Sequence, residues 1–146
     1  MEREQRKPFS LRRAAPADWD FWRGIEPHCP AVQFEEKARS GRAFFICLGR
    51  EPVGLLDFTL LWDKLPFLNC LFVLPQGRGQ GAGRFAMGAW EQEMKKAGYQ
   101  MVLLSTQADE EAQHFYRKLG YQDCGCLILN QCPLAQPAEL FFCKTL

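Results

Sequence analysis

Between Leu71 and Arg84 the chain reads LFVLPQGRGQGAGR, which predicts an apolar β-strand, a glycine-rich turn and the start of a helix. The turn carries four glycines: Gly77, Gly79, Gly81 and Gly83. Glycines lack the Cβ atoms that would keep an anion away from the backbone. The amphipathic segment 84–97 would direct free N–H groups and the positive end of its dipole into the turn. The stretch therefore predicts a site for phosphate or pyrophosphate, and so for a nucleotide-like cofactor.

The composition is typical of one globular domain. The chain has 146 residues, of which 47% are hydrophobic and 24% charged, and its formal net charge is +1. The near-neutral charge disfavours a nucleic-acid-binding surface, and no apolar stretch approaches the roughly 20 residues that cross a bilayer. The charged start lacks the apolar segment of a secretory signal. We expect residues 1–8 to be a flexible leader, residues 9–146 to form a single domain, and the protein to be cytoplasmic.

The cysteines predict no metal site. There are seven of them with only two histidines, no C-x-x-C pair exists, and Cys124 and Cys126 are too close for a common zinc knuckle. Several cysteines lie inside apolar, strand-like runs. They are expected to be reduced core residues, as in a cytosolic protein. A cysteine nucleophile paired with His114 is the alternative, although nothing nearby in the sequence would orient such a pair.

Hydrophobic periodicity predicts a single mixed α/β domain of the α+β type. The expected order is β-α-α-β-β-β-α-β-α-β-β, a mostly antiparallel central sheet of six to seven strands flanked by about four helices. The expected strands are 9–13, 43–48, 53–61, 67–74, 101–104, 123–129 and 139–144. The expected helices are 16–26, 31–38, 81–97 and 109–119.

Three phosphate-binding motifs compete for the glycine turn. A P-loop is excluded because no placement of the glycines supplies its lysine. The dinucleotide fingerprint fits formally as Gly77-x-Gly79-x-x-Ala82, but no carboxylate follows in Gly98–Val102 to hold a ribose. The third pattern, R-x-x-G-x-G, is met by Arg78–Gly83 directly after the strand.

With this third pattern, the sequence resembles the GCN5-related N-acetyltransferase (GNAT) family. A second block, Ala112–Tyr121, reads AQHFYRKLGY and is similar to the family segment A-x-x-F-Y-x-K-x-G-F/Y. The opening Leu11–Asp18 also resembles the family's usual first strand and helix start. The resemblance extends over almost the whole chain. It implies a cleft for CoA where the fourth and fifth strands splay apart, and acetyl-CoA as cosubstrate without a metal.

The resemblance assigns the cofactor residues. Backbone amides of the turn would bind the pyrophosphate, and two arginine side chains would add contacts to it. In the preceding strand, a bulge would expose main-chain groups to pantetheine, and the Val73 N–H would donate to the thioester oxygen as it becomes an oxyanion. The residues concerned are Leu71, Phe72, Val73, Arg78, Gly79, Gln80, Gly81, Ala82, Gly83 and Arg84.

The second block carries the expected general acid. By the resemblance, Phe115 and Tyr116 would contact the cofactor. Tyr116 would protonate the departing thiolate, because a tyrosine hydroxyl with its ordinary pKa near ~10 is protonated at neutral pH. Asp109 stands where many relatives carry an asparagine that contacts pantetheine. An aspartate suits a helix N-cap equally well, so Asp109 is expected either to contact the cofactor or to cap the helix.

The general base is the least determined catalytic group. Many relatives carry a carboxylate on the fourth strand, where this chain has Asn69, which cannot act as a base. Asp57, Asp63 and Glu139 are the candidates. Alternatively, the amine arrives neutral or loses its proton through water.

The resulting expectation is direct transfer of an acetyl group to a small-molecule or peptide amine in a ternary complex. A non-catalytic acyl-CoA-binding or regulatory module is the alternative, and transfer to a hydroxyl or of a longer acyl chain also stays open. Relatives are often dimers, so a homodimer is possible. Two groups of residues could shape an apolar or cationic acceptor site, although most of them fit core packing or a solvated helix face equally well. They are the aromatics Trp19, Trp22, Phe34, Trp62, Phe67 and Phe141, and the acids Asp18, Asp20, Glu26, Glu35, Glu36 and Asp63.

Overall fold

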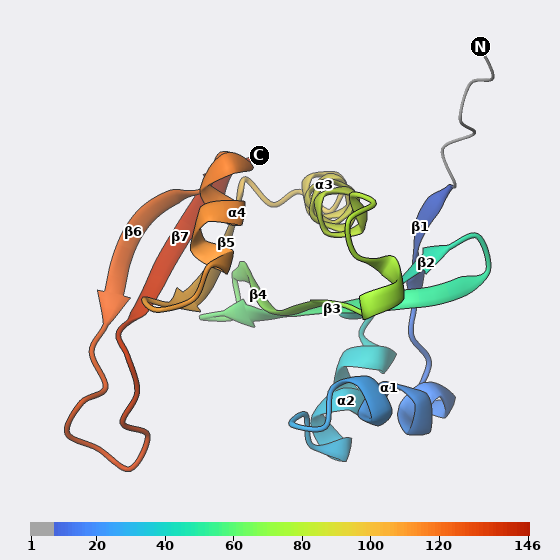
Figure 1. Ribbon diagram of the computed structural model, residues 1–146, viewed down its shortest axis with the longest axis horizontal. Coiled ribbons are helices and arrows are strands. Elements are labelled where there is room, and N and C mark those ends of the chain that lie inside the picture. The colour runs from blue at the N-terminus through green and yellow to red at the C-terminus, as the bar shows by residue number, and fades with distance from the viewer. Residues whose placement is uncertain (1–7) are drawn as a thin grey trace. The chain divides into compact units, whose positions relative to one another are not determined.

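The structure is a computed structural model that describes residues 8–146, so the expected leader, 1–8, lies outside the described residues apart from Pro8. Within this range the chain forms seven strands and four α-helices, in the predicted order (Figure 1). The elements are β1 (Phe9–Arg13), η1 (Pro16–Asp18), α1 (Trp19–Ile25), α2 (Ala31–Arg39), β2 (Ala43–Leu48), β3 (Glu51–Leu61), β4 (Leu65–Val73), η2 (Pro75–Gly77), α3 (Ala82–Lys96), β5 (Met101–Gln107), α4 (Ala112–Lys118), β6 (Gln122–Leu127) and β7 (Glu139–Thr145).

The strands form one open mixed sheet in the order β1-β2-β3-β4-β5-β7-β6. The pairs β1–β2, β2–β3, β5–β7 and β6–β7 are antiparallel, whereas β4 and β5 are parallel. The parallel register joins Phe67 to Leu103 and Leu68 to Leu104. The predicted mixed, mostly antiparallel sheet with about four helices is confirmed.

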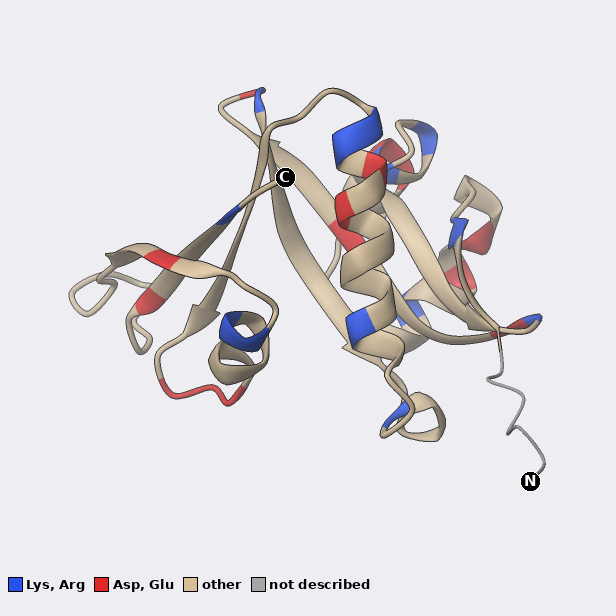
Figure 2. Ribbon diagram, turned by 90° about the horizontal axis from the view of Figure 1, so that it is seen from above, with Lys and Arg blue, Asp and Glu red and all other residues tan. Residues whose placement is uncertain are grey.

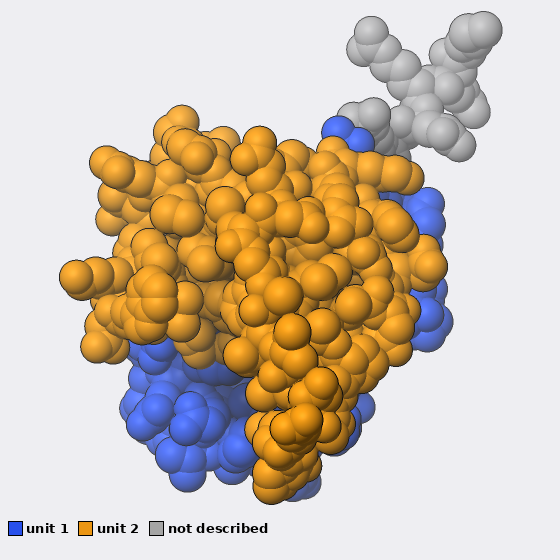
Figure 3. Space-filling model, turned by 90° about the vertical axis from the view of Figure 1, so that its left-hand side faces the viewer, with its two compact units in different colours: residues 1–58, 70–90 blue, residues 59–69, 91–146 orange. Residues whose placement is uncertain are grey.

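The chain divides into two compact units (Figure 3). Unit 1 comprises Met1–Phe58 and Cys70–Trp90, and unit 2 comprises Thr59–Asn69 and Glu91–Leu146. The boundary between the units passes through β3, β4 and α3. Each unit therefore contains segments that are distant in the sequence.

In unit 1, α1 and α2 pack on one face of β2 and β3. The ring of Trp22 lies 5.0 Å from that of Phe34 and 5.4 Å from that of Phe45, measured between centroids. In the same unit, Lys37 of α2 donates from Nζ to Oδ1 of Asp57 in β3 at 3.0 Å, and both side chains are buried. The ion pair satisfies two charges that would otherwise be costly to bury.

The first half of α3 packs on the opposite face of unit 1. Trp90 meets Phe58 of β3 at 5.7 Å between ring centroids, and Phe85 stacks on Phe9 of β1 at the same distance. Met87 is fully buried in this layer. The helix ends at Lys96, one residue before the predicted end, and Ala97 is exposed.

In unit 2, β5 is buried through Val102, Leu103 and Leu104, as its continuous apolar run predicts. Phe142 of β7 is also fully buried, and the Arg117 guanidinium of α4 lies 5.2 Å from its ring centroid.

The charges of α3 are arranged along its length (Figure 2). Lys95 and Lys96 lie in the last turn, where the helix dipole favours cations. The first turn contains no acidic residue and instead carries Arg84, so positive charge gathers at the positive end of the dipole. An anion bound at this helix start would offset that repulsion. None of the helices within residues 8–146 has the length and apolar character to cross a membrane.

Candidate active site

The glycine turn connects β4 to α3 within unit 1. The first intrahelical hydrogen bond runs from Phe85 N to Gly81 O at 2.9 Å, so the N–H groups of residues 82–84 precede the helical ladder. Gly79 and Gly81 have φ values of +74° and +83°, a left-handed conformation that other residues rarely adopt. Residues 78–81 of the turn are exposed, Ala82 is buried, and the turn lies at the positive end of a fifteen-residue helix. This geometry suits a phosphate.

Gly77 serves packing. We expected it to admit an anion, as the other glycines of the turn do, but Gly77 is buried in η2. A Cβ at this position would lie 2.8 Å from Cβ of Val53 and 3.1 Å from its carbonyl oxygen. Gly77 therefore lets the turn lie directly against β3.

The two arginines of the turn differ in their contacts. The Arg78 Nε donates to the carbonyl oxygen of Val73 at 3.0 Å, and its guanidinium lies 5.7 Å from the ring centroid of Phe72. A guanidinium has five N–H donors, so this bond leaves others for an anion. Arg84 is exposed in the first turn of α3. Both side chains have capacity for the charge-assisted contacts that the sequence predicts.

The end of β4 is closely fitted to β3. Leu74 N donates to Val53 O at 2.7 Å, and Gly54 leaves space for the carbonyl oxygen of Phe72. The register irregularities that the structure describes lie at Ile46–Cys47 and at Asp123–Gly125. The bulge expected near Leu71–Val73 and the CoA cleft stay predictions.

Tyr116 lies on α4 in unit 2 and is buried. Its ring meets those of Phe115 and Tyr121 edge-on, at 5.1 and 5.9 Å between centroids. Hydrogen bonds hold the Tyr121 side chain in place. Its hydroxyl donates to Oε2 of Glu91 at 3.0 Å, and Lys144 Nζ donates to Oε1 of the same carboxylate at 2.7 Å. Burial, and then the negative charge of Glu91, raise the pKa of Tyr121 well above its ordinary value. The rings around Tyr116 are therefore held in place.

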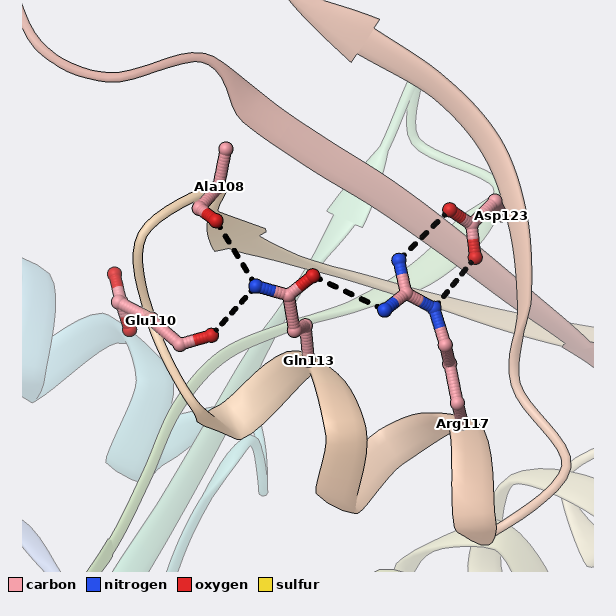
Figure 4. Close-up of polar contacts among 5 residues, drawn as sticks. All are labelled: Ala108, Glu110, Gln113, Arg117 and Asp123. Carbon is pink, nitrogen blue, oxygen red and sulfur yellow. Dashed lines mark hydrogen bonds and ion pairs between the residues drawn. The ribbon is translucent and has the colours of Figure 1, made fainter.

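The loop before α4 corrects the expectation for Asp109 (Figure 4). The helix begins at Ala112, three residues after the predicted start at residue 109, and Glu111 rather than Asp109 occupies the N-cap position, without a side-chain hydrogen bond. Gln113 holds the preceding loop against the helix instead, because its Nε2 donates to the carbonyl oxygens of Ala108 and Glu110 at 2.9 and 2.8 Å. Asp109 is exposed, so its role toward the cofactor stays a prediction.

Arg117 extends the same network to β6. It donates to Gln113 Oε1 at 3.0 Å and, through two nitrogens, to both carboxylate oxygens of Asp123 at 3.0 Å (Figure 4). These hydrogen bonds hold the pKa of Asp123 below its ordinary value. The network fixes the helix that carries Tyr116.

The three candidate bases have different surroundings. Asp57 is buried, and its Oδ1 lies 3.0 Å from Nζ of Lys37, so this carboxylate is already engaged in an ion pair. Asp63 is exposed at the β3–β4 turn, with φ of +60°. Glu139 is half-buried and accepts hydrogen bonds from Ser105 Oγ and Gln136 Nε2, both at 2.8 Å. Nothing in the sequence pattern marks Ser105 or Gln136, because their link to Glu139 depends on strand register.

The aromatic acceptor candidates separate into core and surface residues. Trp22 and Phe34 belong to the core of unit 1, and Trp19 packs on Phe34. Trp62 is 76% exposed at the β3–β4 turn. Phe67 and Phe141 are half-buried and pair at 5.9 Å between centroids in unit 2.

The cysteines do not all lie in the core as expected: Cys47 is buried, whereas Cys124, Cys126 and Cys132 are exposed. All seven cysteines are free thiols. Burial, reinforced by Asp57, raises the pKa of the Cys70 thiol to about 12, so Cys70 is a poor nucleophile. His114, the proposed partner of a cysteine nucleophile, is exposed, and its Nε2 lies 3.8 Å from Oε2 of Glu111. Between residues 8 and 146, no group of three or more His, Cys, Asp or Glu side chains is arranged to hold a metal ion.

The fold is that of N-acetyltransferases of known structure. Ard1 from Thermoplasma volcanium superposes with a TM-score of 0.79 at 16% identity, covering 94% of this chain and 97% of that one. Arabidopsis thaliana Naa50, in complex with the bisubstrate analogue CoA-Ac-MVNAL, superposes with a TM-score of 0.77 at 14% identity, covering 94% of this chain and 99% of Naa50. The ribosomal-protein-S18-alanine N-acetyltransferase from Escherichia coli superposes with a TM-score of 0.76 at 17% identity, covering 94% of each chain.

The chain belongs to the Acetyltransferase (GNAT) family, whose sequence model matches residues 11–121. No curated protein matches it in a sequence search. The matched range includes the glycine turn of unit 1 and, in unit 2, the segment that carries Asp109, Phe115 and Tyr116. The family assignment expected from these two motifs is confirmed.

Proposed function

We propose that the protein transfers an acetyl group from acetyl-CoA directly to a primary amine. The observation that carries this proposal is the glycine turn, where backbone amides, two arginines and a helix start without acidic residues converge. These groups suit the pyrophosphate of CoA. The bisubstrate analogue bound to the Naa50 neighbour supports both the cofactor and an amine acceptor.

In this proposal the chain's own groups perform each step. The Val73 N–H polarises the thioester carbonyl, and the amine nitrogen attacks its carbon. The C–S bond then breaks, and Tyr116 donates a proton to the departing thiolate. The tight packing of Tyr116 against Phe115 and Tyr121 favours this assignment, because a general acid must be held in one orientation.

The test is release of free CoA thiol from acetyl-CoA with a panel of spermidine, L-lysine, phenethylamine and a peptide with a free N-terminal alanine. We expect turnover with at least one amine. Tyr116→Phe should lower kcat about ten-fold or more while leaving acetyl-CoA affinity nearly unchanged. Tyr99→Phe, the same change at a half-buried tyrosine outside the proposed site, is the matched control and should retain wild-type kcat. Unchanged turnover in Tyr116→Phe would remove the general-acid assignment.

The second candidate is a non-catalytic acyl-CoA-binding module, which Asn69 on β4 favours because it is not a base. Tight acetyl-CoA binding without thiol release for any amine would select this candidate.

A further inference from the structure

One face of β5 and β7 in unit 2 gathers polar and aromatic side chains. Ser105 is paired with Phe141 and Gln107 with Glu139, and residues directly opposite in an antiparallel pair point to the same side. Phe142 and Lys144 alternate with them and point to the other side, where they meet side chains of α4 and α3. Glu139, Ser105 and Phe141 therefore lie on the face turned away from those helical contacts.

The Glu139 carboxylate is held by two neutral donors. Ser105 Oγ donates to Oε1 and Gln136 Nε2 to Oε2, each at 2.8 Å. Neutral donors fix the orientation of a carboxylate without cancelling its charge. A carboxylate has about four lone-pair sites, so each oxygen can accept a further hydrogen bond. Because Glu139 is half-buried, solvent screens its charge less than it would at the open surface.

An aromatic pair lies on the same face. Phe67 of β4 is in register with Leu103 of β5. Leu103 lies two residues before Ser105 and therefore points to the same side of β5. The ring of Phe67 pairs with that of Phe141. Aromatic faces attract cations and also cover an apolar stem. A fixed carboxylate together with two phenyl rings suits a primary ammonium group on an aliphatic or aryl stem.

We propose that Glu139 is the catalytic residue that binds the acceptor's ammonium group and takes its proton. This assignment rests on the proposed function. One N–H proton passes from the ammonium to a Glu139 oxygen, and the freed lone pair on nitrogen attacks the thioester carbon. The C–S bonding pair leaves with sulfur, which Tyr116 protonates. The nitrogen then loses its second proton, which passes through solvent to the Tyr116 phenolate, and Glu139 releases the first proton to solvent. One ammonium ion and acetyl-CoA thus give one amide, CoA thiol and one released proton, with both side chains restored.

Two observations place the proton acceptor on β7. The other two candidate bases are Asp57, buried against Lys37, and Asp63, exposed at the β3–β4 turn. The parallel register of β4 and β5 has Leu68 and Leu104 as its last pair. The next residue of β5 is Ser105, whose hydroxyl donates to Glu139. The carboxylate missing from β4 at Asn69 is thus replaced by one that Ser105 positions from β7.

The test compares kcat/KM of wild type and Glu139→Gln with phenethylamine at pH 7 and pH 10. At pH 7 the amine arrives as its ammonium ion, so the variant should lose about 100-fold, within the range for general base catalysis. Near pH 10 about half of the amine is neutral and the deficit should shrink to about five-fold or less. Ser105→Ala, which loses one of the two donors, should show a smaller deficit of the same pH dependence. Glu51→Gln, an exposed carboxylate in unit 1, is the matched control and should equal wild type at both pH values.

The possible failures are distinguishable. If wild type turns over and Glu139→Gln stays within two-fold of it at pH 7, the assignment of Glu139 is wrong and the proposed function stands. An equal loss at both pH values together with a lower Tm would show a structural role for Glu139, and would also overturn the assignment. If Glu139→Gln does not fold, an unchanged pH 7 rate in Ser105→Ala overturns it. Absence of turnover by wild type with any amine overturns the proposed function and this assignment with it.

Discussion

Replacing Gly54 by alanine tests whether β3 sets the position of the proposed thioester-binding end of β4. Within unit 1, a Cβ on Gly54 would overlap the carbonyl oxygen of Phe72 and lie 3.2 Å from both Val73 Cα and Ile46 Cδ1. Two of these three atoms belong to the backbone and cannot rotate away. The end of β4 must therefore shift relative to β3. Overpacking of this kind costs about 1–3 kcal/mol, and backbone contacts place Gly54→Ala at the upper end of that range.

Thermal unfolding and cofactor binding measure the two consequences. For a chain of this size, 1 kcal/mol corresponds to roughly 2–4 °C, so the Tm of Gly54→Ala should fall by about 6–12 °C. The acetyl-CoA Kd should rise as well, because Phe72 and Val73 move. Gly88→Ala is the matched control: this exposed helical position has no heavy atom within 4 Å of a built Cβ, so the change should stabilise by about 0.5–1 kcal/mol. A Gly54→Ala variant with wild-type Tm and Kd would refute the reasoning.

Two further predictions concern buried polar groups. Lys37→Met removes the ammonium 3.0 Å from the buried Asp57 carboxylate, and urea unfolding should show a loss of about 3–5 kcal/mol; a loss below 1 kcal/mol would contradict the buried-pair interpretation. Tyr121 has a raised pKa in the folded state, so the unfolded chain releases its phenolic proton first, near pH 10, and stability contributed by Tyr121 falls as pH rises beyond that value. Tyr121→Phe should therefore lose less stability than wild type between pH 9 and pH 11 in urea unfolding, and an identical loss would show that Tyr121 does not titrate as inferred.

Local sequence signals predicted the features that depend on few neighbouring residues. The strand–turn–helix reading of Leu71–Arg84 holds because backbone conformation at Gly79 and Gly81 is decided within the turn itself. The apolar run that begins at Met101 predicted a buried strand for the same reason, since no polar residue interrupts it. The order of the strands and α-helices along the chain could be predicted in full, whereas the short 3-10 helices η1 and η2 were not predicted.

Features that depend on distant residues could not be predicted. A residue larger than glycine does not fit at position 77, because Val53 of β3 lies too close for a Cβ atom. Asp109 was a plausible cap by residue type, yet the helix begins at Ala112 and Glu111 occupies the N-cap position. The surroundings of Glu139 require the β5–β7 register and the loop residue Gln136 together. Sequence reasoning could therefore name Glu139 as a candidate but could not separate it from Asp57.

The position of β7 has a consequence for biosynthesis. β7 follows β6 in the chain but lies between β5 and β6 in the sheet, so β6 cannot join the sheet before β7 is made. During translation, β5 exposes the edge that β7 will cover while about thirty more residues are synthesised, at roughly 5–20 residues per second. An unpaired strand edge is a template for pairing with another chain. The nascent protein is therefore most prone to aggregate during the seconds before β7 leaves the ribosome.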